Sequence, residues 1–317
     1  MNAMALWCTS EETAELRPGI EGDGVLVDTV FSGISRGTES LVFRGHIPPS
    51  EATRMRGPEQ EGDFPFPVKY GYSAVGRVRE GSLNGQLVFA LHPHQDHFRL
   101  PEANLHPLPE DVPPERAVLA ANMETALNIL WDSQASAGDR IAVVGAGVVG
   151  SLVAYLAARL PGGDVTVVDS NSSRQRIADE FSCNFAGPED APEECDVVIH
   201  TSGTEAGLVS SLIMAGQEAT VVEASWHGDR MVSLPLGADF HSKRLRLQSS
   251  QVGSIPPTRA ARWDYSRRLS AALGLLADSR LDVLISGETE FAKLPAEYGT
   301  ILSSPDTLCH RVRYTAS

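Results

Sequence analysis

The stretch RIAVVGAGVVGSLVAYLAARL, residues 140–160, decides the fold. Five residues that suit a buried strand come first, three glycines follow, and a largely apolar run of helical length ends the stretch. In a G-x-G-x-x-G turn the first glycine allows the tight turn, the second lets the backbone approach a pyrophosphate, and the third lets helix and strand pack closely. The stretch therefore predicts a dinucleotide-binding turn formed by Gly145, Gly147, Val148, Val149 and Gly150. The alternative is a glycine turn of an α/β sheet that holds no ligand.

An acidic residue follows the turn at the distance that such a cofactor site uses. Asp169 ends the next strand-like segment and lies about 20 residues beyond Gly150. A carboxylate there accepts hydrogen bonds from both ribose hydroxyls of NAD and repels the 2′-phosphate of NADP. Arg174 lies five residues further on and is a candidate to reach that phosphate. We expect NAD(H) rather than NADP(H).

Extended and helical segments alternate through the middle of the chain, which is typical of a parallel sheet covered on both faces. The predicted strands are 140–144, 164–168, 196–200, 219–224 and 245–249, and the predicted helices are 148–160, 172–182, 204–215 and 261–278. Ligands of such sheets sit at the carboxyl ends of the strands. Thr201 and Ser225 follow two of these ends, so we expect them beside the cofactor, with loop packing as the alternative.

The segments before and after this region have a different pattern of apolar and turn-forming residues. Up to about residue 115, short apolar stretches alternate with Gly, Pro and Asn, which indicates strands of a partly closed β-barrel. The last segment returns to a strand-like style and is expected to complete the first domain. We predict a β domain from residues 1–117 and 284–317, and a Rossmann-type doubly wound domain from residues 118–283.

Composition excludes several classes of partner. The chain has 317 residues and a formal net charge of −15, with no long basic stretch, so nucleic acid and anionic membranes are not expected as partners. The four cysteines lie far apart, without a C-x-x-C motif or a secretory signal sequence ahead of them. We expect reduced thiols in a cytoplasmic protein.

This order of domains resembles the medium-chain dehydrogenase/reductase superfamily over almost the whole chain. The stretches LAANMETALNILWD and VFALHPHQDHFRLP are most similar to the branch that contains bacteriochlorophyllide a dehydrogenase, which oxidises a hydroxyethyl group on a chlorin. The resemblance implies a GroES-like catalytic domain, an active site in the interdomain cleft, a small alcohol or carbonyl substrate and a homodimer.

The zinc ligands of that superfamily are missing from the matching positions. The first ligand is a cysteine in a G-I-C-G-T-D-like loop, which aligns with GISRGTE and leaves Ser35 or Arg36 in its place. Two further family ligands lie in a G-H-E stretch, which aligns with Gly71, Tyr72 and Ser73. A catalytic zinc needs about three protein ligands. The resemblance therefore argues against zinc.

Polar side chains brought to that place by the aligned loops are the candidates to replace the metal. They are Tyr72 as a donor to the substrate oxygen, Arg36 as a holder of an oxyanion, Ser35, His46 as a proton relay, and Glu124 as a base. Each has a plainer alternative: a packed tyrosine, an Arg36–Glu39 ion pair, a surface imidazole on a loop, and a pairing or capping role for Glu124. In HPHQDH, residues 92–97, metal binding is disfavoured because Pro93 indicates a turn, and we place His94 or Gln95 near the nicotinamide instead.

The function that we predict is a zinc-independent, NAD(H)-linked oxidoreductase that interconverts a secondary alcohol and a ketone by hydride transfer. Two rivals are an NADPH-dependent reductase of quinones or enones, against which Asp169 counts, and a dinucleotide-binding protein without turnover.

Overall fold

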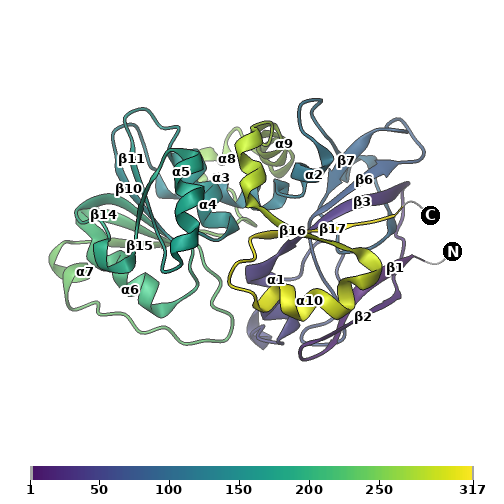
Figure 1. Cartoon of the computed structure of the whole chain (residues 1–317), viewed down its shortest axis with the longest axis horizontal. Helices are drawn as coiled ribbons and strands as arrows, with labels where there is room; N and C mark the ends of the chain where they lie inside the picture. The colour runs from purple at the N-terminus through teal and green to yellow at the C-terminus, as the bar shows by residue number, and fades with distance from the viewer. Residues whose placement is uncertain (1–2, 316–317) are drawn as a thin grey trace. The chain divides into compact units, whose positions relative to one another are not determined.

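The computed structural model describes residues 3–315, which divide into two compact units. Unit 1 holds the residues up to Ala121 together with those from Leu269 onward, and unit 2 is Asn122–Arg268. Figure 1 shows that the described chain begins and ends in unit 1. The predicted domain division after residues 117 and 283 stays a prediction about functional domains.

Unit 2 is built on one six-stranded sheet in which every neighbouring pair is parallel, in the order β12-β11-β10-β13-β14-β15. Its strands are β10 (Arg140–Val144), β11 (Asp164–Val168), β12 (Asn184–Ala186), β13 (Cys195–His200), β14 (Ala215–Glu223) and β15 (Arg246–Ser249). Its helices are α4 (Val148–Ala157), α5 (Gln175–Phe181), α6 (Glu205–Met214), α7 (Asp239–Ser242) and α8 (Pro257–Ala260), with the 3-10 helices η3 (Ser172–Arg174) and η4 (Pro188–Asp190).

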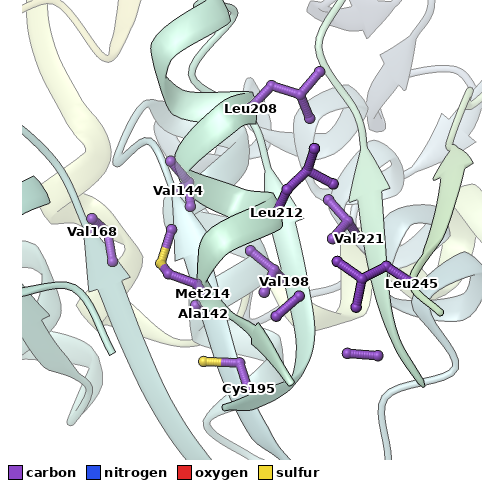
Figure 2. Packing of buried hydrophobic residues seen from close by; sticks show 12 residues of the cluster. Ala142, Val144, Val168, Cys195, Val198, Leu208, Leu212, Met214, Val221 and Leu245 are labelled. Atoms are coloured by element: carbon purple, nitrogen blue, oxygen red, sulfur yellow. The ribbon is translucent and has the colours of Figure 1, made fainter. Parts of the chain in front are cut away.

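Apolar side chains of α6 hold one face of this sheet together. Figure 2 shows Leu212 of the helix beside Val221 of β14, and Leu208 and Val198 belong to the same buried cluster. These side chains are almost completely buried. Burying one side chain of this size contributes about 1.5–3 kcal/mol, so the continuous apolar strands that the sequence shows become the core of the unit.

Unit 1 is rich in β structure and has two sheets, in the orders β2-β1-β5-β4 and β16-β17-β3-β6-β7-β9, with β8 also paired to β3. The strands are β1 (Met4–Ser10), β2 (Thr13–Pro18), β3 (Val25–Ser35), β4 (Glu61–Gly62), β5 (Val68–Lys69), β6 (Ala74–Val78), β7 (Leu87–Ala90), β8 (His97–Leu100), β9 (His106–Pro107), β16 (Ile285–Glu290) and β17 (Cys309–Arg313). Its helical segments are α1 (Arg36–Phe43), η1 (Pro49–Glu51), η2 (Glu102–Asn104), α2 (Pro114–Ala117), η5 (Ser279–Leu284), η6 (Phe291–Lys293) and α10 (Leu294–Ser303). Two further helices, α3 (Ala120–Ser133) and α9 (Tyr265–Leu275), contain the residues at which one unit passes to the other.

The C-terminal segment joins the sheet that the N-terminal strands begin. Strand β17 pairs antiparallel with β3, and Cys309 lies opposite Ser35. The return of the chain to the first domain was expected from the sequence, but the whole last segment was expected to be strand-like. The structure instead places helix α10 there, because Pro295 suits the first turn of a helix and Leu294, Tyr298 and Ile301 recur at helical spacing as buried residues.

The fold class predicted from sequence is confirmed, since a β-rich unit accompanies a parallel Rossmann-type sheet. The predicted strands of the sheet agree with β10 and β11 in full and with the others to within a few residues, and the short strand β12 was not predicted. None of the helices within residues 3–315 has both the length and the apolar character that a membrane span requires.

Candidate active site and cofactor site

The glycine turn of unit 2 uses its three glycines in three different ways. Gly145 has φ +102°, a backbone conformation that favours glycine. A Cβ at Gly150 would lie 1.9 Å from the carbonyl oxygen of Gly145, so no larger residue fits there. A Cβ at Gly147 would meet no heavy atom within 4 Å. The first and third glycines are thus required by the turn itself, and the second leaves open space directly before α4.

The carboxylate of Asp169 is fixed beside that turn. Its Oδ2 accepts a hydrogen bond of 2.6 Å from the backbone N–H of Ala146, and its Oδ1 accepts one of 2.7 Å from the backbone N–H of Asn171. A carboxylate oxygen has lone pairs for further donors. The open space at Gly147, the N–H groups that begin α4 and this carboxylate fit the pyrophosphate and ribose of a dinucleotide. Arg174 ends η3 as a buried side chain.

Thr201 and Ser225 brace the loops at the strand ends. The Thr201 hydroxyl donates to the carbonyl oxygens of Val144 and Gly145, at 3.1 and 2.8 Å. The Ser225 hydroxyl accepts a 3.0 Å hydrogen bond from the backbone N–H of Gly203. The loop-packing alternative is therefore realised in the structure, and their contact with a cofactor stays a prediction.

Unit 1 contains a sealed polar network around Glu39, a residue of α1 with no exposed surface. Glu39 Oε1 accepts a 2.7 Å hydrogen bond from the backbone N–H of Ser35, the residue that caps α1. Glu39 Oε2 lies 3.0 Å from His94 Nε2 and accepts a 2.7 Å hydrogen bond from the Tyr298 hydroxyl. Burial and the charge of Glu39 both raise the pKa of Tyr298 well above its usual value. We call Glu39 and His94 the closed pair.

One order of donors satisfies every member of this network. His94 Nδ1 lies 2.7 Å from the Ser32 hydroxyl, which lies 2.9 Å from the Tyr314 hydroxyl. If Tyr314 donates to Ser32, and Ser32 donates to His94 Nδ1, the imidazole carries its proton on Nε2 and donates it to Glu39. With this order of donors, no donor of the network is left unpaired in the interior.

Tyr72 lies beside this network through Ser35. The hydroxyls of Ser35 and Thr38 form hydrogen bonds with the half-buried Tyr72 phenol. Burial raises the pKa of Tyr72 to about 12. The two hydrogen bonds lower this pKa, but burial has the larger effect, and the charge of Glu39 adds to the rise. The phenol is therefore protonated at neutral pH and can donate a proton. The structure thus joins two of the predicted catalytic residues, Ser35 and Tyr72.

The residues at this place do not fit a catalytic zinc. Ser35 and Tyr72 present hydroxyls that are hydrogen-bonded to one another, and Ser73 donates its hydroxyl to the carbonyl oxygen of Val118 at 2.7 Å. Zinc in proteins is bound by Cys, His, Asp and Glu, with about three such ligands at a catalytic centre. Among residues 3–315, no group of three such side chains with converging ligand atoms includes a residue of unit 1.

The other predicted catalytic residues have separate surroundings. The Arg36 guanidinium donates to the carbonyl oxygen of Ser304 at 3.0 Å. His46 follows α1 as an exposed residue, in agreement with the surface alternative. In unit 2, Glu124 Oε1 accepts a 3.0 Å hydrogen bond from the buried Arg268 guanidinium. Burial raises the pKa of Glu124 although Arg268 opposes the rise. The catalytic roles of Arg36, His46 and Glu124 stay predictions.

Sequence reasoning missed the central part of the network. Glu39 was considered only as a partner of Arg36, and Tyr298 was not considered, because it comes from the segment whose helix was not predicted. Glu39 lies four residues after the cap Ser35, one position beyond the acidic residue of a capping box, although its side chain still reaches back to the Ser35 N–H.

The three histidines of HPHQDH do not converge. His92 stacks on Phe98 with ring centroids 4.0 Å apart, His94 belongs to the closed pair, and His97 pairs with Asp96 at 2.9 Å. Burial lowers the pKa of His92 to about 3. Gln95 accepts a 2.8 Å hydrogen bond from Lys69, and its predicted contact with the nicotinamide stays a prediction.

Comparison with known proteins shows what this chain is similar to. It is 25% identical over 225 residues to 2-dehydro-3-deoxy-L-galactonate 5-dehydrogenase of Pseudoalteromonas atlantica, a match that covers 67% of this chain and 62% of the relative. It is 27% identical over 233 residues to L-threonine 3-dehydrogenase of Ruegeria pomeroyi, covering 72% and 63%. The matched region thus spans about three fifths of these curated relatives. No protein-family model matches the chain.

The fold extends over the whole chain. The crystal structure of L-idonate 5-dehydrogenase from Escherichia coli superimposes with a TM-score of 0.78 at 13% identity, covering 99% of this chain and 98% of that one. This chain has the fold of the medium-chain alcohol dehydrogenases. The placement of the chain in the bacteriochlorophyllide a dehydrogenase branch stays a prediction.

Proposed function

We propose that this chain is an NAD(H)-dependent oxidoreductase that interconverts a secondary alcohol and a ketone without a catalytic zinc. The observation that carries the proposal is the glycine turn: open space at Gly147 before α4, beside a carboxylate held by Ala146. The two curated relatives described above are named as dehydrogenases of a sugar acid and of an amino acid, which supports a small polar alcohol as substrate.

The cofactor would be held by groups that unit 2 already orients. The N–H groups of Val148 and Val149 begin α4 and would bind the pyrophosphate, and Asp169 would accept the ribose hydroxyls. A 2′-phosphate would meet the negative charge of Asp169, which favours NAD(H) over NADP(H). When bound, this cofactor supplies or accepts the hydride.

Tyr72 would perform the proton transfer. In ketone reduction the carbonyl oxygen becomes negative as the carbon is reduced, and a nearby donor stabilises that charge. A phenol whose pKa is about 12 holds its proton at neutral pH and still gives it to a far more basic alkoxide. The hydroxyls of Ser35 and Thr38 would then relay a proton from solvent to the Tyr72 phenolate, each taking up one proton as it gives one, while Glu39 positions Ser35 through its backbone N–H.

Dinucleotide binding is tested first with a matched pair of variants. Gly147→Ala fills the open space, whereas Gly187→Ala adds the same methyl group to another open site of unit 2 whose φ, −72°, matches the −69° of Gly147. Tryptophan fluorescence on titration with NADH should show at least about tenfold weaker binding in Gly147→Ala and unchanged binding in Gly187→Ala. Tighter binding of NADPH than of NADH would promote the quinone or enone reductase, and binding of neither would refute the oxidoreductase.

Turnover tests the role of the phenol. Tyr72→Phe should lower kcat for ketone reduction by about 10²–10⁴-fold, the usual contribution of a positioned proton donor, without changing the Kd for NADH. Tyr70→Phe is the control, because its ring lies 6.0 Å from that of Tyr72 and is not assigned a catalytic role. Wild-type turnover should persist after dialysis against a chelator, and its loss would show that a metal is needed.

A further inference from the structure

Unit 2 holds a second carboxylate–histidine pair that the proposed function does not use. His200 ends β13 and Glu223 ends β14, and the two residues are register partners on neighbouring parallel strands. His227 follows four residues after Glu223, in the loop beyond the strand. We call Glu223 and His200 the open pair, and we call these two residues with His227 the His200 cluster.

The three side chains converge on one carboxylate oxygen. Glu223 Oε2 lies 2.7 Å from His200 Nδ1 and 3.3 Å from His227 Nε2. Each residue contributes one nitrogen or oxygen atom that can bind a metal, and the three atoms lie within 4.8 Å of one another. Within residues 3–315, this is the one group of three or more His, Cys, Asp or Glu side chains that come so close. His200 is fully buried, whereas the side chains of Glu223 and His227 each keep 15% of their surface exposed. The cluster is therefore compact, and solvent reaches two of its three side chains.

These distances suit a metal ion. Zinc–nitrogen and zinc–oxygen bonds of about 2.0–2.2 Å place neighbouring ligand atoms of a tetrahedral site about 3.3 Å apart. The distance from Glu223 Oε2 to His227 Nε2 already has this value, and that to His200 Nδ1 is shorter by a fraction of an ångström. The two imidazole nitrogens lie within 4.8 Å of one another, so a bound ion would draw the side chains closer together.

Outer contacts hold each prospective ligand in orientation, as they do around known metal sites. His200 Nε2 lies 2.6 Å from the Ser202 hydroxyl, which leaves Nδ1 directed at Glu223. Glu223 Oε1 accepts a 2.6 Å hydrogen bond from the backbone N–H of Ser225. The loop that carries His227 is tied by Arg230, which donates to the carbonyl oxygens of His227 and Gly203 at 3.1 and 3.0 Å.

We infer that the His200 cluster is a binding site for one divalent first-row transition metal ion, coordinated by His200 Nδ1, His227 Nε2 and Glu223 Oε2. Two imidazoles and one carboxylate are a ligand set that binds zinc, iron, cobalt or nickel in preference to magnesium or calcium. Three protein ligands leave at least one coordination position for water or for an oxygen atom of a ligand. The site depends on unit 2 alone and is independent of the zinc position discussed for unit 1.

Cobalt is the probe that tests this site, because its visible absorption reports coordination. The untagged full-length chain, stripped with a chelator, should bind one equivalent of Co²⁺ with an intense four- or five-coordinate spectrum, and one equivalent of Zn²⁺ should abolish that spectrum. His227→Gln should weaken Co²⁺ binding by at least about 100-fold, since it removes a direct ligand. His241→Gln, which changes an exposed histidine of the same unit, should leave binding unchanged.

Two measurements keep the inference falsifiable if a variant is unstable. Circular dichroism establishes whether His227→Gln is folded, and X-ray absorption of the Zn²⁺-loaded wild type needs no variant at all. The latter should show two imidazoles and oxygen ligands. Failure of the wild type to bind Co²⁺, octahedral cobalt without imidazole ligands, or equal binding by folded His227→Gln would overturn the inference. None of these readouts uses NADH or a substrate, so they are independent of the proposed function.

Discussion

The closed pair and the open pair use the same two residue types for different ends. In the closed pair, Glu39 accepts hydrogen bonds from His94, Tyr298 and the backbone of Ser35, and neither Glu39 nor His94 has exposed surface. In the open pair, Glu223 accepts from the backbone of Ser225 and faces two imidazoles. One carboxylate is thus enclosed by protein donors, and the other keeps a side open to solvent.

This difference in enclosure predicts different chemistry. The donors around Glu39 form a fixed set, so the closed pair can position Ser35 but has no room for a ligand. The two imidazole nitrogens that face Glu223 are atoms that bind metals when they carry no proton, and a cation between them and the carboxylate would replace these hydrogen bonds. A carboxylate–histidine pair therefore acts as scaffold when all its partners are protein donors, and as a candidate binding site when some are exchangeable.

The largest expected contrast is in stability. Glu39→Gln replaces one carboxylate oxygen by an NH₂ group. That group would face a hydrogen-bond donor instead of accepting from it, so we expect the free energy of unfolding to fall by about 3 kcal/mol. Glu223→Gln should lose only about 1 kcal/mol, because water can reach its side chain. Urea unfolding measures both.

Glu11→Gln, at an exposed position of unit 1, is the control for the change of residue type and should have little effect. If Glu39→Gln and Glu223→Gln destabilise the protein equally, enclosure does not distinguish the two pairs.

A smaller contrast comes from removing one outer partner of each pair. Tyr298→Phe removes a donor to Glu39 while keeping the ring that packs edge-on against Phe43 at 5.1 Å. We expect a loss of about 1–2 kcal/mol, since the hydrogen bond is made to a charged group. Ser202→Ala removes the partner of His200 Nε2 in the open pair and should cost less, about 0.5–1 kcal/mol, because His200 retains its contact with Glu223. Thermal or urea unfolding of the two variants gives the comparison, and a larger loss in Ser202→Ala would reverse it.

The two units also differ in how much of their sites could be predicted from sequence. The glycine turn depends on residues close in the chain, so the spacing of Gly145, Gly147 and Gly150 was sufficient to predict a turn between a strand and a helix. The acid that follows, Asp169, is fixed by the length of one helix and one strand. A local pattern therefore predicts a site when the site is itself local.

The network of unit 1 joins residues that no local pattern relates. The hydrogen bond between Ser32 and Tyr314 spans 282 positions of the sequence, and that between Glu39 and Tyr298 spans 259. The first bond depends on β17 lying beside β3. The second depends on α10, the helix that was not predicted from the sequence. The alignment of loops did bring Ser35 and Tyr72 to one place, but their common link to Glu39 required the order of strands in the sheet.

The smallest expected effect is the dependence of the open pair on pH. Burial would raise the pKa of Glu223, but hydrogen bonds and charge from His200, with the Ser225 backbone, more than offset this and lower it below the usual 4.5. A carboxyl group whose pKa is lower in the folded state stabilises that state above its unfolded pKa, and this contribution disappears as the pH falls through the folded value. The stability advantage of the wild type over Glu223→Gln should therefore be full at pH 6 and shrink as the pH falls below about 4.5.

Urea unfolding of both proteins over this pH range measures this advantage, and His227→Gln is measured alongside because His227 faces the same carboxylate. An advantage that stays constant down to pH 3.5 would mean that the carboxylate of the open pair gains nothing from its imidazoles, and the contrast with the closed pair would then rest on enclosure alone.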